Sequence, residues 1–60
     1  MITKQFIGSD GIKREIDGKK FDKEFRVYRV RGDVTKFDAL QELAQMCAIE
    51  FKCERVILSL

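Results

Sequence analysis

Apolar and polar residues alternate over the first residues of the chain, a pattern that predicts a β-strand. Ile2 and Phe6 fall on one face of a strand over residues 1–7, with polar residues on the other face. Residues 8–11 read Gly-Ser-Asp-Gly, a composition that ends a strand in a short loop. We therefore expect a first strand followed by a tight connection.

The dipeptide Asp17-Gly18 is typical of a two-residue hairpin turn, because the central positions of such a turn need positive φ angles. A turn there would place Ile16 opposite Lys19 in an antiparallel pair. Opposite charges would also face each other across the ladder further from the turn. The sequence thus predicts a β-hairpin centred on this dipeptide.

The strand after that turn is too long to be regular. Residues 19–31 would span about 40 Å if fully extended, more than a small domain covers. The apolar pattern also changes phase, since Phe21 and Phe25 share one face whereas Tyr28 lies on the other. A bulge between Asp22 and Tyr28 explains both features, and a projecting basic ribbon is the alternative; we favour the bulge.

An amphipathic helix is predicted over about residues 36–50, after Thr35 and Asp38, which have the spacing of a loose capping box. Its apolar positions fall on one broad arc at helical spacing. The arc contains Phe37, Leu40, Leu43, Ala44, Cys47, Ala48 and Phe51.

A final strand is expected over residues 54–60.

These elements predict a single small α+β domain over residues 1–60, in the order β-β-β-α-β. The first three strands should form an antiparallel meander, with the helix covering one face as a second layer. A right-handed crossover would place the last strand parallel to the first or to the third strand, and the sequence leaves that choice open.

Composition argues against an enzyme. With 45% hydrophobic and 37% charged residues, the chain has the composition of a folded domain. It has no Trp and no His, and His is the commonest general base in enzymes. Cys47 and Cys53 are expected to be structural thiols, with a disulfide between them as the alternative. No cofactor, metal or catalytic residue is predicted.

The chain has no apolar run long enough for a signal peptide or a membrane span. Two cysteines are too few for the disulfide framework of a small secreted domain. We expect a cytoplasmic protein without membrane contact. Its size is also typical of proteins encoded by phages and other mobile elements.

The net charge of +2 is unevenly distributed. Residues 13–31 hold eight basic and four acidic residues, whereas residues 32–60 hold three basic and five acidic ones. Within the basic segment, strand alternation places Arg26 and Tyr28 on one face and Arg29 and Arg31 on the other. Nucleic-acid binding is therefore the alternative function, and its candidate residues are Lys19, Lys20, Arg26, Tyr28, Arg29 and Arg31.

Three further apolar residues lie beside the core arc of the helix. They mark a contact surface for a protein partner or a second copy, unless a loop or the last strand covers them. Our first hypothesis is a small non-enzymatic regulator or inhibitor that binds protein and forms a homodimer. Its candidate residues are Ala39, Met46 and Ile49 on the helix, with Arg26, Tyr28, Arg29 and Arg31 on the strand.

Overall fold

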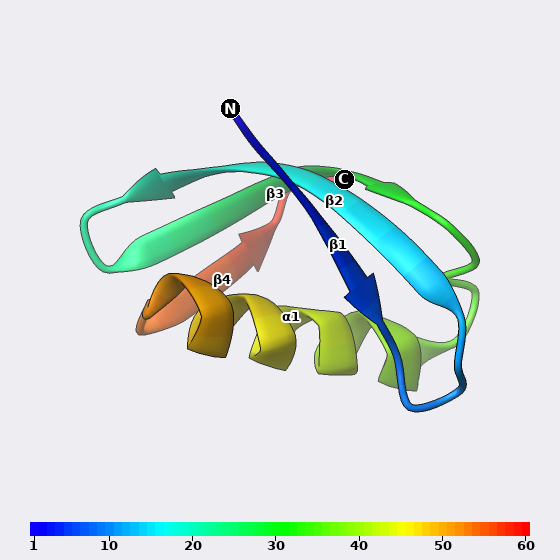
Figure 1. Cartoon of the computed structure of the whole chain (residues 1–60). Helices are drawn as coiled ribbons and strands as arrows, with labels where there is room; N and C mark the ends of the chain where they lie inside the picture. Colours follow the sequence, from blue (N-terminus) through cyan, green and yellow to red (C-terminus); the bar gives the residue numbers. More distant parts are fainter.

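A computed structural model describes all 60 residues as a four-stranded sheet with one helix against one of its faces (Figure 1). The order β-β-β-α-β and the two-layer α+β architecture confirm the prediction from the sequence. The elements are β1 (Ile2–Ile7), β2 (Lys13–Phe21), β3 (Glu24–Arg31), α1 (Phe37–Phe51) and β4 (Arg55–Leu58).

The strands lie in the order β1-β2-β3-β4, so that β1 and β4 are the edges of the sheet. The first three strands are antiparallel neighbours, as the meander prediction requires, and β4 runs parallel to β3. Parallel neighbours need a crossover connection, and α1 supplies it beneath the sheet (Figure 1). The position of the last strand, open at the sequence level, is therefore beside the third strand.

The predicted turn at Asp17-Gly18 is wrong. β2 continues through this dipeptide, and the chain reverses at Asp22-Lys23, where Asp22 adopts a φ of 47°. The register explains the difference, because it places Ile16 opposite Val30 on the helix-facing side of the sheet. Burial of apolar pairs on one face fixes a register more strongly than a local turn signal does.

A β-bulge interrupts β3, as the change of apolar phase predicted. Asp17 pairs with Arg29 while the next residue, Gly18, pairs with Val27, so Tyr28 is the additional residue on β3. The bulge thus lies at the end of the interval in which it was expected. It turns Val27 and Val30 to the same side of the sheet although they are three residues apart.

The core lies between this side of the sheet and α1. Phe25 is fully buried, and its ring stacks on that of Phe51 with centroids 4.3 Å apart. Gly18 leaves the space that the Phe25 ring occupies, since a Cβ there would stand 2.3 Å from a ring carbon. The buried core consists of Phe6, Ile16, Phe25, Val27, Leu43 and Cys47.

The ends of α1 differ from the sequence prediction. Lys36 is the N-cap and no side chain caps the helix, because Thr35 instead donates from its amide and hydroxyl to Asp33 Oδ1. The helix is also rotated relative to the predicted arc: Phe37 is 71% exposed, whereas Met46 packs against the core. Leu43 and Cys47 are the fully buried centre of the helix face.

Candidate functional site

The bulge in β3 gathers the candidate strand residues on one face of the sheet. Regular alternation would put Arg26 and Tyr28 on one face and Arg29 and Arg31 on the other. With the bulge at Tyr28, Arg29 and Arg31 lie instead on the same side as Arg26, away from α1. The sequence analysis therefore chose residues that the structure brings together, but assigned two of them to the wrong face.

We call this side of the sheet, which α1 does not cover, the open face (Figure 1). Strand alternation and register place six basic and three acidic side chains on it, an excess of three positive charges. The basic residues are Lys13, Lys19, Arg26, Arg29, Arg31 and Arg55, and the acidic residues are Glu15, Asp17 and Glu24.

Ion pairs fix two of the arginines on the open face. The Arg31 guanidinium bonds to the carboxylates of Glu15 and Asp17, and its Nη2 lies 2.6 Å from Asp17 Oδ2. Arg26 donates from Nε to Glu24 Oε2 at 2.6 Å. These arginines therefore hold defined positions, and part of their charge is neutralised.

On the open face, Asp17 links β2, to which it belongs, with the two neighbouring strands. The Thr3 hydroxyl on β1 donates to Asp17 Oδ1 at 2.8 Å, and Arg31 on β3 donates to both carboxylate oxygens. The hydrogen bond from Thr3 and those from Arg31 lower the pKa of Asp17, although burial opposes this shift. Asp17 is buried, and both of its carboxylate oxygens already accept hydrogen bonds within the protein. Its role is therefore to hold the Arg31 guanidinium in place.

Three cations of the open face have no carboxylate partner. Lys13, Lys19 and Arg29 make no ion pair, unlike the other three basic residues of this face. Arg29 follows the bulged Tyr28 directly, and Lys19 lies opposite Arg26 on the neighbouring strand. Two of these three charges therefore lie beside the bulge and towards the β2–β3 turn, whereas Lys13 lies at the opposite end of β2.

Two aromatic rings are also exposed on this face. Phe21 is 39% exposed and Tyr28 is 37% exposed. Lys19 Nζ lies 5.3 Å from the centroid of the Phe21 ring, and Arg26 Cζ lies 5.0 Å from it, both in cation–π range. Glu24 and, to a smaller extent, the Tyr28 hydroxyl raise the pKa of Arg26.

Phe21 was not predicted as a site residue, because alternation along one strand placed it on the same face as Phe25. Phe21 instead ends β2 on the open face. No signal in the sequence marks this position, because the turn that follows Phe21, where Asp22 adopts a φ of 47°, became evident only in the structure. The residue next to Lys19 also differs from expectation: Lys20 pairs with Phe25 and lies on the helix side of β2.

The three residues of the predicted helix surface do not form a patch. Met46 is half-buried against the core, and Ala39 lines a polar hollow at the other end of α1. Ile49 is 79% exposed and is the only one of the three that is fully available to a partner. The rotation of α1 accounts for this dispersal, because it turns Met46 inward.

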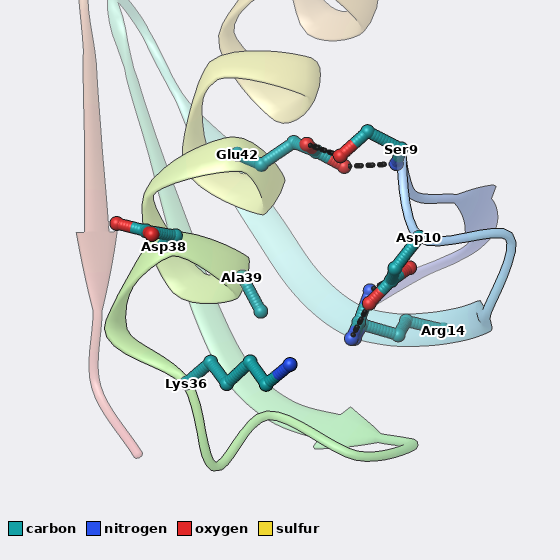
Figure 2. A pocket seen from close by; sticks show the side chains of 7 residues that line it. All are labelled: Ser9, Asp10, Arg14, Lys36, Asp38, Ala39 and Glu42. Atoms are coloured by element: carbon teal, nitrogen blue, oxygen red, sulfur yellow. Dashed lines mark hydrogen bonds and ion pairs between the residues drawn. The ribbon is translucent and has the colours of Figure 1, made fainter.

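That polar hollow, of about 160 Å³, lies between the β1–β2 loop and the first turns of α1 (Figure 2). Ser9 donates to Glu42 from its amide at 2.7 Å and from its hydroxyl at 2.6 Å. Arg14 donates to both carboxylate oxygens of Asp10 and, through Nε, to the carbonyl of Asp33 at 2.6 Å. Figure 2 shows the Ser9–Glu42 pair bridging the loop and the helix, and the Asp10–Arg14 pair on the loop side of the hollow.

These contacts fasten the loop to the helix and to the end of β3. The Arg14 side chain is almost fully buried, and the bonds from Arg14 and from the Ile12 amide lower the pKa of Asp10 to about 2. Gly8 allows the close approach, since a Cβ there would stand 2.7 Å from Arg14 Nη1 and would force that side chain to shift. The polar groups of the two pairs form hydrogen bonds with each other. We therefore interpret these contacts around the hollow as a structural clamp that holds the β1–β2 loop in place.

The two thiols lie near the end of α1, Cys47 within the helix and Cys53 just after it. Cys47 and Cys53 are both free, and burial raises the pKa of the Cys47 thiol to about 11, which suppresses its nucleophilicity. No three side chains among the Cys, Asp and Glu residues are grouped so as to hold a metal ion. α1 is too short and too polar to cross a membrane.

No protein-family model, curated protein or solved structure matches this chain. An argument about its function therefore rests on the geometry of its own residues. The open face combines excess positive charge with two exposed aromatic rings.

Proposed function

We propose that the protein is a non-enzymatic binding module that holds nucleic acid on the open face of its sheet. The observation that carries the proposal is the gathering of Arg26, Tyr28, Arg29 and Arg31 on this face by a single bulge. Arginines bind phosphates, and exposed aromatic rings accept bases, so both parts of a nucleotide find a complementary group here.

The charge on the open face supports the same partner. Most contacts between proteins and nucleic acids go to the phosphate backbone, and their number sets the affinity. Lys13, Lys19 and Arg29 are free to make such contacts without breaking an internal ion pair. Arg31 contributes a guanidinium whose orientation is already fixed by Glu15 and Asp17.

Fluorescence anisotropy with labelled oligonucleotides at several salt concentrations tests the proposal. We expect binding at low salt, with the logarithm of affinity falling against the logarithm of salt with a slope of roughly −2, as for three contacted phosphates. Arg29→Gln should reduce the magnitude of this slope by the contribution of about one phosphate contact. Absence of binding to every DNA and RNA oligonucleotide at low salt would exclude this function.

Protein binding is the second candidate, and exposure of Phe37 and Ile49 on α1 favours it. The two side chains are twelve residues apart, which is about 18 Å along a helix, so they do not form one patch. In this case the chain would act in the cytoplasm as a small regulator or inhibitor, with a second copy as its simplest partner. Sedimentation as a monomer at high micromolar concentration would exclude the homodimer.

A further inference from the structure

We infer that the open face binds single-stranded rather than duplex nucleic acid, with one base stacked on Tyr28 and another on Phe21. This inference rests on the proposed function and names its ligand more narrowly. The juxtaposition that carries it is the pairing of each exposed ring with an uncompensated cation: Lys19 beside Phe21 and Arg29 beside Tyr28.

The shape of the sheet does not suit a duplex groove. The major groove admits a helix or a two-stranded ribbon. The end of the β2–β3 hairpin is not a free ribbon, because β4 pairs with β3 from Glu24 to Val27, close to the turn. Three strands span about 10 Å between their outer backbones, and their side chains bring the total width above the ~12 Å of that groove.

The exposed rings suit unpaired bases. In a duplex the bases stack on one another and cannot lie on a protein ring, whereas the bases of a single strand can. Tyr28 and Phe21 belong to the two central strands, with Phe21 at the turn end of β2. The uncovered face of these strands gives a single strand room to lie across both rings.

The spacing of the rings also favours an extended strand. The register places Phe21 roughly three to four residues along the ladder from Tyr28, or on the order of 12 Å between their Cα atoms. Stacked neighbours in a nucleic-acid strand rise only about 3.4 Å per nucleotide. The bases on Phe21 and Tyr28 are therefore not direct stacking neighbours, and the strand between them must open out, which a paired strand resists.

The cations place the phosphates of that strand. Lys19 Nζ stands 5.3 Å from the centre of the Phe21 ring, and Arg29 follows Tyr28 directly in β3. Because Lys19 and Arg26 both stand over the Phe21 ring, a base that covers this ring displaces one of them. Lys19 and Arg29 have no carboxylate partner, so both are available to the phosphates of the nucleotides on Phe21 and Tyr28. The stacking contribution tolerates any base, because every base has a π-face, so we expect weak sequence preference.

Tyr28 is itself the reporter for the test. The chain has one Tyr and no Trp, so its intrinsic emission comes from Tyr28 alone. We would titrate the wild-type protein with a twelve-nucleotide oligo-dT, with a duplex of the same length and with inorganic polyphosphate, following Tyr28 emission and anisotropy of labelled ligands in parallel. Free tyrosine corrects for light absorbed by the nucleotides.

The inference predicts that oligo-dT quenches Tyr28 emission by more than about half at saturation, while the duplex binds at least about tenfold more weakly without quenching. Tyr28→Leu should lose about fivefold or more in affinity for oligo-dT, whereas Tyr28→Phe, which keeps the ring, should bind like the wild type. Circular dichroism confirms that both variants are folded.

The outcomes separate the two proposals. Binding of duplex with equal or greater affinity, or of oligo-dT without quenching, overturns the single-strand inference and leaves the proposed function standing. Equal binding of polyphosphate and oligo-dT means that the face takes any polyanion, which also overturns the inference. No binding of any nucleic acid overturns the proposed function itself.

Discussion

The ring of Phe25 lies over Gly18, so close that a Cβ on Gly18 would stand 2.3 Å from Cε1 of Phe25 and 2.6 Å from the carbonyl oxygen of Arg26. This contact joins the bulge to the core, because Gly18 pairs with Val27 beside the bulged Tyr28. The same glycine that lets the core close therefore helps to fix the arrangement of the open face.

Gly18→Ala should destabilise the protein by about 3 kcal/mol, or prevent folding, because neither the backbone carbonyl nor the buried ring can move away freely. Urea denaturation followed by circular dichroism measures the loss. Gly11→Ala is the matched control: a Cβ at Gly11 meets no atom within 4 Å, so only its φ of 79° opposes the change. A Gly18→Ala variant as stable as Gly11→Ala would contradict the packing described here.

Lys52→Gly should stabilise the protein by about 1 kcal/mol. Lys52 ends α1 with φ 52° and ψ 53°, a left-handed conformation that costs most residues about 1–2 kcal/mol and glycine almost nothing. Glu50→Gly, two residues earlier within the helix, is the control and should destabilise by about 1 kcal/mol. Thermal unfolding of both variants gives opposite signs if the helix ends at this residue, and the same sign if it does not.

Met46→Glu and Ile49→Glu should differ in their effect on stability. Met46 is half-buried against the core, so a carboxylate there should cost about 2–3 kcal/mol. Ile49 is 79% exposed, and its replacement should change the free energy of unfolding by less than about 0.5 kcal/mol. If Ile49→Glu instead dissociates a dimer in sedimentation experiments, the protein-binding candidate gains its first direct support.

Stability should fall as the pH is lowered through the range in which carboxylates titrate. The pKa of Asp10 is lowered to about 2, and those of Asp17, Asp33 and Glu42 are also below their ordinary values. A carboxylate with a lowered pKa in the folded state contributes its full stability above its unfolded pKa, near 4, and loses it as the pH falls towards the folded value.

Chemical denaturation between pH 7 and pH 2 should therefore show stability decreasing below about pH 4.5. Asp10→Asn should be less stable at pH 7 and should have a flatter pH dependence, because its carboxylate no longer titrates against Arg14. Stability that rises on acidification would contradict the polar contacts of the hollow and of Asp17.

The sequence predicted the order of elements, the helix and the existence of a bulge, because hydrophobic periodicity reports which residues a strand or helix buries. It failed at Asp17-Gly18, where a strong local turn signal was overridden by long-range packing of Ile16 and Phe25. Local patterns carry no information about the strand that will lie opposite, so the turn was misplaced by five residues.

The candidate site was predictable in composition but not in arrangement. Arg26, Tyr28, Arg29 and Arg31 were recognisable as a basic strand with an aromatic residue, but their common face depends on where the additional residue of the bulge falls. The clamp had no signal beyond the Gly8 loop, because two of its contacts join residues far apart in the chain: Ser9 with Glu42, and Arg14 with the carbonyl of Asp33.

Lys19 and Lys20 provide the most direct test of the open face as the binding surface. They are adjacent and carry the same charge, but Lys19 lies on the open face and Lys20 on the helix side of β2. We would compare the affinities of Lys19→Gln and Lys20→Gln for one labelled oligo-dT at fixed low salt. We expect a several-fold loss of affinity for Lys19→Gln and affinity close to the wild type for Lys20→Gln. Equal losses, or a greater loss for Lys20→Gln, would show that the open face is not the binding surface.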